Sequence, residues 1–574
     1  MDNGIGKWNY KQAAINPRRT ALVREDTGQQ LTYADLNERS NRLARSLEAA
    51  GIGKGDRVIV LSTNSIEFLE ALFGIAKTGA ISVPVNFRLT GPEVAFIASD
   101  CRPKAVIASA NLVELVASAY DDERVDIPLT IITELRGGDL PRIDGTEVRD
   151  FEDLMADGAP EDDERDVEKS DIGMIMYTSG TTGRPKGAML THANIEANNY
   201  NIMGMAPGIS KLDVTTTPCP LFHVGGLNVH TFPLLFLGGK VVVLPAFEPV
   251  GALRSMADNG ATVQFLVPAM WAAITAVPNF DSYDVSAMRF GMSGGAPTPL
   301  TVIEFFQNKG WMFFEGFGMT ETCAGALVIS PEDTVERRGS VGQPALLTDA
   351  RVVNELDEGV AVGEVGELVM RGENIFAGYF EMPEATEEAL RGGWFHSGDL
   401  AKVDEDGFYT LVDRKKDMII SGGENVYPIE VEQVLHRHES ILDVAVIGVP
   451  DEKWGETVVA VVVALIAGFV PADYLWNTVS IGTLMAFTVV AIGVIVLRRT
   501  QPDLPRPFKV PGFPVTPILT VAVCIYVLSG LPGETWIIFS VWLAVVLAYY
   551  FIWGRRHAVL NRTKPAALDE EEAT

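Results

Sequence analysis

A run rich in glycine and hydroxyl side chains offers the clearest chemistry in this sequence. Residues 177–187 read YTSGTTGRPKG and follow an apolar stretch at Ile172–Met176. Glycines let a backbone approach an anion closely, hydroxyls add hydrogen-bond donors and Lys186 adds positive charge, so the run suits the phosphates of a nucleotide triphosphate. Its spacing is not that of a Walker A loop, which argues against P-loop NTPase chemistry. The predicted nucleotide-binding residues of this run are Thr178, Ser179, Gly180, Thr181, Thr182, Gly183 and Lys186.

A second glycine-rich run has the pattern of a hydrolytic nucleophile. Residues 291–295 fit G-x-S-x-G, which would make Ser293 the nucleophile of a serine hydrolase. The pattern is short, and a hydrolase gives no role to residues 177–187 or 394–425. We therefore keep the hydrolase as a minor alternative, which labelling of Ser293 by a fluorophosphonate would support.

Short apolar strands alternate with amphipathic helices around these runs. The patterns predict a helix over Leu31–Leu47, a strand over Arg57–Leu61, a helix over Ser65–Lys77 and a strand over Ala80–Val85. Alternation at this spacing predicts an α/β fold with a largely parallel sheet.

Two further features indicate how the chain is organised. The acidic run Asp150–Asp171 contains Pro and Gly and lacks an apolar period, so it is expected to be a solvated surface connector. Helices and strands then continue to alternate to about Tyr409, and a smaller unit is expected to begin at Asp413.

The charge of the chain is divided unevenly. The formal net charge is −29, although the mean hydropathy is +0.16. Residues 464–574 carry eight Lys or Arg and seven Asp or Glu, so residues 1–463 carry about −30. An acidic body repels nucleic acid and anionic lipid, which argues against both as main partners. The four cysteines form no C-x-x-C pair and the N-terminus lacks a signal-peptide stretch, so the body is expected in the reducing cytoplasm.

Three long apolar segments set the C-terminal tail apart. Residues 478–497, 515–531 and 535–554 contain no charged residue. A bilayer core of about 30 Å needs about 20 helical residues, so all three are predicted to be transmembrane helices. The basic clusters after the first and third segments would be cytoplasmic, and the tail would tether the body to the inner (plasma) membrane. Transport is an alternative, but three or four spans are too few to close around a substrate.

Five further stretches, together with residues 177–187, identify a family. They are PLFHVGG at 220–226, GMSGGAP at 291–297, EGFGMTE at 315–321, WFHSGD at 394–399 and DRKKDMIISGGEN at 413–425. In this order they resemble the adenylate-forming enzymes, which include acyl-CoA synthetases, luciferases and the adenylation domains of peptide synthetases. The resemblance covers residues 1 to about 463.

The resemblance implies roles for individual residues. Thr320 would touch the α-phosphate, and Glu321 would hold Mg²⁺, for which a carboxylate is a suitable ligand. Asp399 and Arg414 would hold the ribose hydroxyls. His223 matches the position of a gate to the acyl tunnel. The implied catalytic residues are thus Lys186, His223, Thr320 and Glu321.

The remaining implied residues line the nucleotide and the coenzyme A path. Lys416 would be the hinge of the small lobe, and Gly422 and Gly423 would leave room for the pantetheine arm. Residues 293–297 and 315–318 would line the adenine and acyl pocket. The implied cofactor-binding residues beyond the first run are Ser293, Gly294, Gly295, Ala296, Pro297, Glu315, Gly316, Phe317, Gly318, Met319, Thr320, Asp399, Arg414, Lys416, Gly422, Gly423 and Glu424.

The implied reaction needs no protein nucleophile. The carboxylate of the acid attacks the α-phosphorus of ATP, pyrophosphate leaves, and the thiol of coenzyme A then displaces AMP. Positioned charges, including Mg²⁺, stabilise the transferring phosphoryl group. The implied cofactors and partners are therefore ATP, Mg²⁺, coenzyme A and a small carboxylic acid.

The resemblance ends inside the small lobe. Family members continue for about 60 residues to a Gly-Lys pair whose lysine reaches the adenylating site, whereas the lysines after Lys453 are Lys509 and Lys564, outside that context. Residues 497–511 instead resemble the last helices of amino-acid permeases. Loss of the lysine should cost about 3–4 kcal/mol, or roughly a hundred- to thousand-fold in adenylation rate.

The predicted fold class is therefore α/β, with a large adenylate-forming domain at 1–412, a truncated α+β lobe at 413–463 and a permease-like α-helical transmembrane segment at 464–574. Three spans would place the acidic body outside the cell, and a fourth span at Thr457–Val470 would cost the lobe a strand. The predicted function is an acyl-CoA synthetase for a medium- or long-chain fatty acid, impaired by the missing lysine. An aryl-acid-CoA ligase and an inactive fusion remain alternatives.

Overall fold

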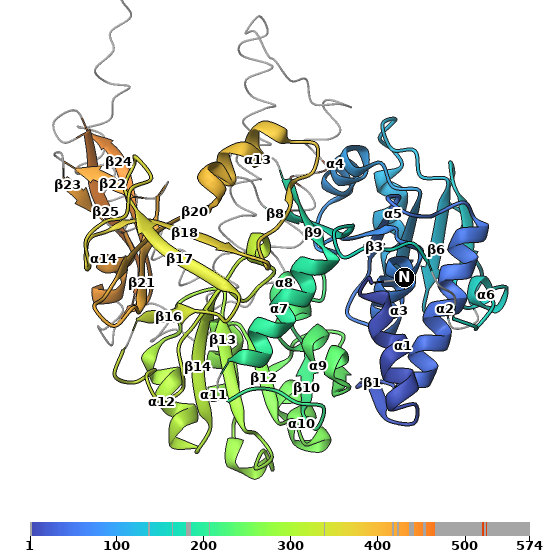
Figure 1. Cartoon of the computed structure of the whole chain (residues 1–574), viewed down its shortest axis with the longest axis horizontal. Helices are drawn as coiled ribbons and strands as arrows, with labels where there is room; N and C mark the ends of the chain where they lie inside the picture. The colour runs from blue at the N-terminus through green and yellow to red at the C-terminus, as the bar shows by residue number, and fades with distance from the viewer. Residues whose placement is uncertain are drawn as a thin grey trace, which may run out of the picture. The chain divides into compact units, whose positions relative to one another are not determined.

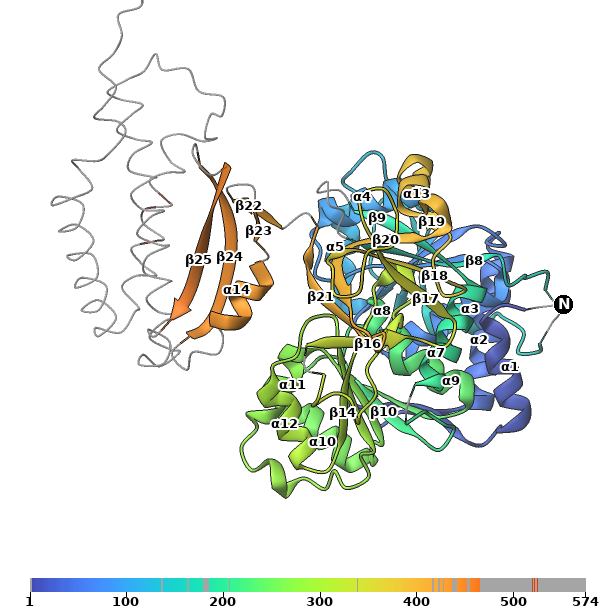
Figure 2. The same ribbon diagram turned by 60° about the vertical axis from the view of Figure 1, so that its left-hand side comes forward.

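The computed structural model describes residues 3–464 and Leu519, Val521 and Cys524. Within the first range it leaves out residues 136–137, 163–164, 179–184, 206, 338, 416–417, 422–423, 427, 436–440 and 452–454. The chain divides into two compact units, residues 1–416 and 417–574. Elements α1 to β21 belong to the first unit, and β22 to β25 with α14 belong to the second (Figure 1, Figure 2).

A mostly parallel sheet forms the N-terminal part of the first unit. Its strand order is β19-β9-β8-β4-β3-β5-β6-β7, with β9 and β19 joined antiparallel beside β8. The α/β part of the predicted fold class is confirmed by this sheet. Its strands are β3 (Arg57–Leu61), β4 (Ile81–Pro84), β5 (Ala105–Ser109), β6 (Leu129–Thr133), β7 (Glu147–Asp150), β8 (Ile172–Thr178), β9 (Lys186–Thr191) and β19 (Gly378–Tyr379).

Helix α3 (Ile66–Thr78) connects β3 and β4 and is buried along its whole length. The side chain of Ser65 accepts a hydrogen bond from the backbone N–H of Phe68 at 3.0 Å, which caps the N-terminus of the helix. Gly79 ends the helix at φ +76°, a left-handed conformation that glycine adopts without a steric penalty. Because every residue of the helix is buried, including Glu67, Glu70 and Lys77, α3 is covered on all sides by the rest of the first unit.

A second sheet combines parallel and antiparallel strands. Its order is β12-β13-β14-β15-β16-β21-β20-β18-β17, with β12, β13 and β14 parallel and the later pairs antiparallel. Its strands are β12 (Val263–Leu266), β13 (Phe290–Gly294), β14 (Met312–Phe317), β15 (Leu327–Val328), β16 (Ser340–Pro344), β17 (Thr348–Val353), β18 (Gly366–Gly372), β20 (Phe395–Val403) and β21 (Tyr409–Arg414).

A smaller sheet with the order β10-β11-β1-β2 joins distant parts of the chain. Strand β1 pairs in parallel with β11, where Leu22 lies beside Val241. Its strands are β1 (Thr20–Arg24), β2 (Gln30–Thr32), β10 (Val214–Thr217) and β11 (Lys240–Val243).

Helices cover these sheets, as when α10, α11 and α12 lie beside β12, β13 and β14 (Figure 1). The α-helices of the first unit are α1 (Gly6–Ile15), α2 (Tyr33–Ala49), α3, α4 (Gly91–Cys101), α5 (Val113–Ala119), α6 (Phe151–Ala156), α7 (His192–Gly204), α8 (Val224–Gly226), α9 (Phe232–Leu237), α10 (Pro249–Asn259), α11 (Pro268–Thr275), α12 (Leu300–Asn308) and α13 (Pro383–Ala389). Shorter helical turns are η1 (Ala110–Leu112), η2 (Leu227–Thr231, π-helical), η3 (Phe280–Ser282), η4 (Thr320–Thr322) and η5 (Arg391–Gly393).

Buried asparagines fix the segment that follows η4. Asn198 on α7 accepts a hydrogen bond from the backbone N–H of Gly325 at 2.9 Å, and Asn374 donates to the carbonyl of Thr322 at 3.1 Å. Buried polar groups of this kind are retained where their hydrogen bonds define a unique backbone path. They therefore hold the short turn that carries Glu321.

The second unit is described in part. Strands β22 (Ile419–Ser421), β23 (Glu424–Val426), β24 (Ile441–Asp451) and β25 (Gly455–Ala464) form an antiparallel sheet in the order β23-β22-β25-β24. Helix α14 (Pro428–Leu435) accompanies them, and Ile419, Val444 and Val446 form a small buried cluster. Residues 455–464 are thus a strand, which leaves Thr457–Val470 unable to act as a fourth membrane span.

The predicted transmembrane part of the fold class is wrong. Across the part of the chain that the structure describes, no helix is both long and apolar enough to cross a membrane. Helix α2, for example, has 17 residues and carries charged side chains such as Asp35 and Arg39, whereas a span needs about 20 apolar ones. Segments 478–497, 515–531 and 535–554 lie outside the described residues apart from Leu519, Val521 and Cys524. The fold class is corrected to the α/β body, and the membrane tether is withdrawn with the helices.

Two smaller expectations also differ from the structure. The acidic run 150–171 contains helix α6, whose N-terminus is capped by Asp150 and whose Phe151 and Leu154 are buried. An acidic cap stabilises a helix start, so the beginning of the run is helical. The described residues from 157 to 171 lie outside any helix or strand and are mostly exposed, as expected of a surface connector. In addition, residues 340–414 form antiparallel strands rather than continued α/β alternation.

Candidate functional site

The two ends of the glycine- and hydroxyl-rich run lie side by side. Strands β8 and β9 are antiparallel, with Thr178 paired to Lys186, and the Thr178 hydroxyl donates to the carbonyl of Lys186 at 3.4 Å. Ser179, Gly180, Thr181, Thr182 and Gly183 lie outside the described residues. Their predicted role in binding phosphate stays a prediction, and the structure adds that both ends of their loop are anchored in one hairpin.

Lys186 and Glu321 lie on either side of Tyr379. The ammonium of Lys186 is 5.0 Å from the centre of the Tyr379 ring, and the Tyr379 hydroxyl donates to Oε1 of Glu321 at 2.9 Å. Burial and the Glu321 carboxylate raise the pKa of Tyr379, so the phenol remains a hydrogen-bond donor. The phenol thus connects the strand that follows the phosphate loop to the carboxylate predicted to hold Mg²⁺.

Glu321 is a buried acid in the turn η4, with 6% of the residue exposed. Burial raises its pKa, while hydrogen bonds from the backbone and Tyr379 and the charges of Arg414 and Lys186 act in the opposite direction. A carboxylate held in this balance gains from a cation beside it, because the cation removes the cost of burying the charge.

Asp399 and Arg414 form an ion pair between neighbouring strands. Asp399 on β20 is directly opposite Arg414 on β21, and Nε of Arg414 lies 2.7 Å from Oδ1 of Asp399. The other oxygen, Oδ2, is buried and has no hydrogen-bond partner among the residues that the structure describes. Burial raises the pKa of Asp399 to about 6, against the opposing charge of Arg414. Oδ2 of Asp399 can therefore accept a hydrogen bond from a ligand, as a residue that binds ribose hydroxyls would.

A closed ring of contacts fixes the backbone on both sides of this pair. Glu367 on β18 accepts from the N–H of Gly398 at 3.3 Å and from the ammonium of Lys415 at 3.2 Å. The N–H of Lys415 in turn donates to the carbonyl of Gly398 at 2.9 Å. Gly398 precedes Asp399 and Lys415 follows Arg414, so Glu367 fixes the neighbours of both members of the ion pair.

The loops after β13 and β14 lie at the same edge of the second sheet. Ser293 is beside Glu315 and Gly294 beside Gly316 in the parallel register, and the exposed residues Gly295, Ala296 and Pro297 follow β13. Parallel sheets bind ligands at the carboxyl ends of their strands, so these residues lie at an edge where a ligand could bind, and their role in an adenine and acyl pocket stays a prediction.

Thr298 connects these two loops. Its hydroxyl donates to Ser293 at 2.7 Å, and its backbone N–H donates to Oε1 of Glu315 at 2.8 Å. Burial raises the pKa of Glu315. Ser293 itself is completely buried within β13 and bonds to Thr298, whereas the nucleophile of a hydrolase sits exposed on a strand-to-helix turn. The geometry therefore disfavours the hydrolase alternative.

Phe317, Gly318, Met319 and Thr320 lead from β14 into the turn of Glu321, and all four are partly exposed. A Cβ atom at Gly318 would lie 1.3 Å from the carbonyl oxygen of Ala324, so glycine is required there for steric reasons. The close approach brings the 315–321 segment back on itself and places Thr320 next to Glu321 on an accessible turn.

His223 caps the short helix α8. Its Nδ1 accepts a hydrogen bond from the backbone N–H of Gly225 at 3.3 Å, and the residue is exposed. Its role as a gate remains a prediction. Lys416, Gly422 and Gly423 lie outside the described residues, and Glu424 is the first residue of β23 in the second unit.

Three residues of the site were not predicted from the sequence: Thr298, Glu367 and Tyr379. None belongs to the stretches that carry the resemblance, and each acts through strands that pair only in the fold. A tyrosine nearly 60 residues from its carboxylate partner has no local signature.

The donors present fit a magnesium ion that is held mainly by phosphates. Among the described residues, no group of three or more His, Cys, Asp and Glu side chains could hold a metal by itself. Mg²⁺ in nucleotide sites is typically bound through one or two carboxylates plus substrate phosphates. Glu321, a single buried carboxylate, is consistent with that arrangement.

Comparison with known proteins gives the family. The family model described as AMP-binding enzyme matches residues 10–380, and the family model described as AMP-binding enzyme C-terminal domain matches residues 430–492. The chain belongs to the AMP-binding enzymes. Residues 508–558 match the C-terminus of AA_permease, which confirms the resemblance predicted for the tail.

Relatives of this AMP-binding enzyme are CoA ligases. The chain is 41% identical to a feruloyl-CoA synthase of Amycolatopsis sp over 80% of this chain and 89% of that protein. It is 36% identical to the long-chain-fatty-acid–CoA ligase FadD13 of Mycobacterium tuberculosis over 80% of this chain and 88% of the other. ATP-bound MatB from Rhodopseudomonas palustris has the same fold, with a TM-score of 0.72 and 30% identity over 81% of this chain and 90% of that chain.

The AMP-binding enzyme described here is thus an adenylate-forming, AMP-producing CoA ligase. Enzymes of this kind use ATP, Mg²⁺ and coenzyme A, as predicted from the sequence. The match of the C-terminal domain to residue 492 extends beyond residue 463, where the resemblance was predicted to end.

Proposed function

We propose that this ligase activates a carboxylic acid with a largely apolar body, an aryl acid in the first place and a medium- or long-chain fatty acid as the second candidate. The feruloyl-CoA synthase is more similar to this chain than the fatty-acid ligase, which favours the aryl class over the fatty acid predicted from the sequence. One observation supports placing the ligase site here. Oδ2 of Asp399, beside Arg414, is a buried oxygen without a partner among the described residues, and it belongs to the same unit as Glu321, Tyr379 and Lys186.

Each residue of the site has a proposed role. Lys186 and the hydroxyls of residues 178–182 bind the phosphates, and Asp399 with Arg414 binds the ribose. Glu321 holds Mg²⁺, which supplies positive charge to the phosphates when bound, and Thr320 contacts the α-phosphate. Residues 293–297 and 315–319 enclose the adenine and the acid, and His223 gates the acid. Lys416, Gly422, Gly423 and Glu424 serve the second half-reaction.

These residues act by position and charge. The acid's carboxylate attacks the α-phosphorus, the bond to pyrophosphate breaks, and the thiol of coenzyme A then displaces AMP from the acyl carbon. Fixed cations and donors stabilise the charge that develops on the phosphoryl oxygens, which is the main route to rate enhancement in phosphoryl transfer. Because the reaction consumes ATP and coenzyme A, we place the ligase body in the cytoplasm.

Adenylation by this chain is proposed to be slow. The sequence lacks a Gly-Lys pair in the position where relatives supply a lysine, and its last lysines are Lys509 and Lys564. Without that charge the first half-reaction should be slower by roughly a hundred- to thousand-fold. Thioester formation from a supplied acyl adenylate should be retained.

An exchange assay with a panel of acids tests this proposal. Ferulate, cinnamate, octanoate and palmitate are each incubated with the purified chain, ATP, Mg²⁺ and labelled pyrophosphate, and label in ATP is measured. The matched control replaces residues 464–574 with the remaining small lobe of a relative, including its lysine. Exchange that is weak in the chain and strong in the control supports the proposal, and the preferred acid identifies the class.

Two results would contradict it. If neither protein exchanges pyrophosphate with any acid, the body is not a working adenylating enzyme. If the control works while the chain forms no thioester even from a synthetic acyl adenylate, the inactive fusion is correct.

A further inference from the structure

A small cavity lies behind the helix that His223 caps. Its volume is about 10 Å³, measured as the space open to the centre of a water molecule, and it is lined by Thr215, Thr217, Gly225, His230, Thr231 and Phe265 among others. Space of this size accommodates about one water molecule or one hydroxyl oxygen. The wall includes polar side chains, such as Thr217 and Thr231, and the aromatic ring of Phe265.

His230 lines this cavity and is 3% exposed. Its Nδ1 is buried and has no hydrogen bond to any residue that the structure describes. Burial lowers the pKa of His230 to about 3, so the imidazole is neutral and offers one donor and one acceptor nitrogen. A buried polar atom without a partner costs about 1–3 kcal/mol, which a ligand or water in the cavity would recover.

The threonine hydroxyls on the wall have already used their protons. Thr231 donates to the carbonyl of Gly226 at 2.8 Å, and Thr217 donates to the same carbonyl at 3.5 Å. Each hydroxyl oxygen keeps lone pairs that can accept a hydrogen bond. The cavity therefore suits a group that both donates and accepts, such as a hydroxyl.

The ring of Phe265 lines this cavity and also lies beside Gly294 of the proposed acid pocket. A Cβ atom at Gly225 would lie 3.2 Å from one edge of the ring, and a Cβ atom at Gly294 would lie 3.3 Å from the other edge. Gly294 belongs to the loop proposed to enclose the acid, and Gly225 belongs to the helix capped by His223. Phe265 thus lies beside Gly225, which lines the cavity, and beside Gly294, which is proposed to line the acid pocket.

We propose that this cavity is the distal end of the acid subsite, and that it binds a hydroxyl group at the far end of an aromatic acid through His230. The proposal rests on the proposed ligase function and deepens it by naming the substrate class. The acid's ring lies against Phe265 and the glycines, and its hydroxyl takes the position of a water molecule.

Binding of matched adenylate analogues tests this inference without requiring catalysis. The probes are non-hydrolysable sulfamoyl-adenosine analogues of para-hydroxycinnamate and cinnamate, which differ by one hydroxyl, titrated into the full chain by calorimetry. We expect the hydroxylated analogue to bind about ten- to hundred-fold more tightly. In His230→Leu this preference should disappear, because the cinnamate analogue keeps its affinity while the hydroxylated analogue loses the additional affinity that its hydroxyl provides. In His230→Gln, which restores a donor and an acceptor, the preference should return in part.

Controls separate this inference from the proposed function and from misfolding. His192→Leu removes another buried neutral histidine, which accepts from the N–H of Ile5, and should lower thermal stability without changing the preference. If neither analogue binds the unaltered chain, the ligase proposal itself fails. Equal affinity for the two analogues means that the cavity holds water alone, and a preference that survives His230→Leu excludes His230; either result overturns the inference.

Discussion

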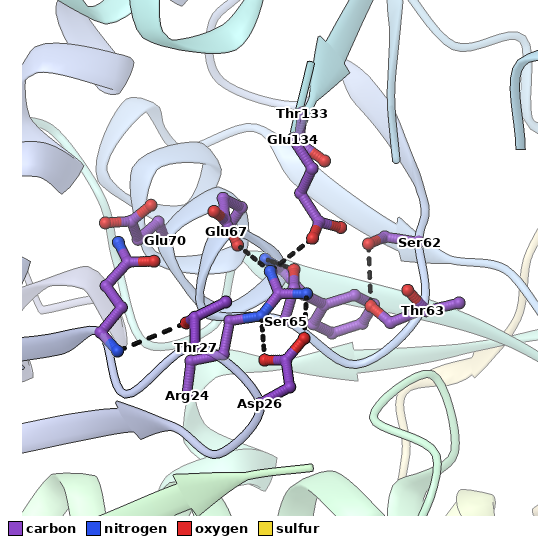
Figure 3. Close-up of polar contacts among 12 residues, drawn as sticks. Arg24, Asp26, Thr27, Ser62, Thr63, Ser65, Glu67, Glu70, Thr133 and Glu134 are labelled. Carbon is purple, nitrogen blue, oxygen red and sulfur yellow. Dashed lines mark hydrogen bonds and ion pairs between the residues drawn. The ribbon is translucent and has the colours of Figure 1, made fainter. Parts of the chain in front are cut away.

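Two clusters in the first unit each bury carboxylates around an arginine, yet they differ in how completely their charges are paired. At the ends of β1 and β6, Arg24 contacts Asp26 at 2.7 Å, Glu67 at 3.4 Å and also Glu134 (Figure 3). On β20 and β21, Arg414 contacts Asp399 through Nε while the Arg414 side chain remains 49% exposed, and Oδ2 of Asp399 has no partner in the described part of the chain.

The difference separates a structural cluster from a binding site. The guanidinium of Arg24 is 6% exposed and meets carboxylates from separate segments, so its hydrogen-bonding capacity is used within the protein. At Asp399, in contrast, one buried carboxylate oxygen has no partner among the described residues and can accept a hydrogen bond from a ligand. A cluster whose hydrogen-bonding groups are all paired (saturated) stabilises the fold. A cluster with an unpaired buried acceptor gains free energy when a ligand donates a hydrogen bond to that acceptor.

The largest effect should come from breaking the saturated cluster. Arg24→Met removes the cation shared by Asp26, Glu67 and Glu134 and should lower the free energy of unfolding by about 3–5 kcal/mol, because buried acids lose their counter-charge. Urea unfolding measures this. KM for ATP should not change, and Arg142→Met, which disrupts a fully exposed pair, should leave stability unaltered. A stability loss no greater than that of Arg142→Met would refute the comparison.

Glu321→Gln should affect chemistry rather than folding. Loss of the carboxylate removes the proposed Mg²⁺ ligand and should slow pyrophosphate exchange by roughly a hundred- to thousand-fold, equivalent to about 3–4 kcal/mol. Thermal stability should stay equal or rise, since the lost carboxylate was buried with a raised pKa. Glu67→Gln is the matched control, which should alter stability and leave exchange intact. Exchange within tenfold of the unaltered chain would show that Glu321 does not hold the ion.

Asp399→Asn should weaken the binding of ATP more than that of the acid. An amide keeps one acceptor but loses the charge that pairs with Arg414, which should raise KM for ATP about ten- to hundred-fold. Steady-state kinetics at varied ATP and fixed acid would measure this. A selective rise in KM for the acid would place Asp399 outside the ribose site.

The pH dependence gives a smaller effect with a defined sign. Burial raises the pKa of Asp399 to about 6, so its carboxyl binds a proton in the folded chain as pH falls through about 6, and ATP affinity should then decline. The same shift favours the folded state at low pH, a contribution fully present below about pH 4 and lost as pH rises through 6. Isothermal titration of ATP between pH 5 and 8 checks this, and Asp399→Asn should flatten the profile.

Glu367→Gln should produce the smallest change, about three- to tenfold in KM for ATP. Glutamine can still accept from the N–H of Gly398 but no longer balances the charge of Lys415. Lys415→Gln should cause a similar change, and the double variant should be no worse than either single one, as expected for partners in one interaction. Additive effects would show that the ring around Gly398 and Lys415 does not act as a unit.

The sequence predicted what is local and missed what arises from pairing between distant strands. Strand β3 coincides with its predicted range, and α3 begins one residue after its predicted start because Ser65 is the cap. The sequence motifs predicted that Glu321, Asp399 and Arg414 belong to one site. Tyr379 and Glu367 were not predicted, because they reach the site through strands β19 and β18, whose pairing is not visible in the sequence. The transmembrane tail was predicted from the length of three apolar segments, from basic clusters and from a resemblance to amino-acid permeases, whereas the described part of the chain contains no helix long and apolar enough to cross a membrane.

The contact at Gly318 has a consequence for anyone who wishes to change the range of acids that the protein accepts. The Ala324 oxygen stands where any other amino acid would carry its first side-chain carbon. Libraries built to alter selectivity should therefore keep codon 318 constant and concentrate their diversity on Gly225 and Phe265, where added or removed volume meets a side chain instead of the main chain.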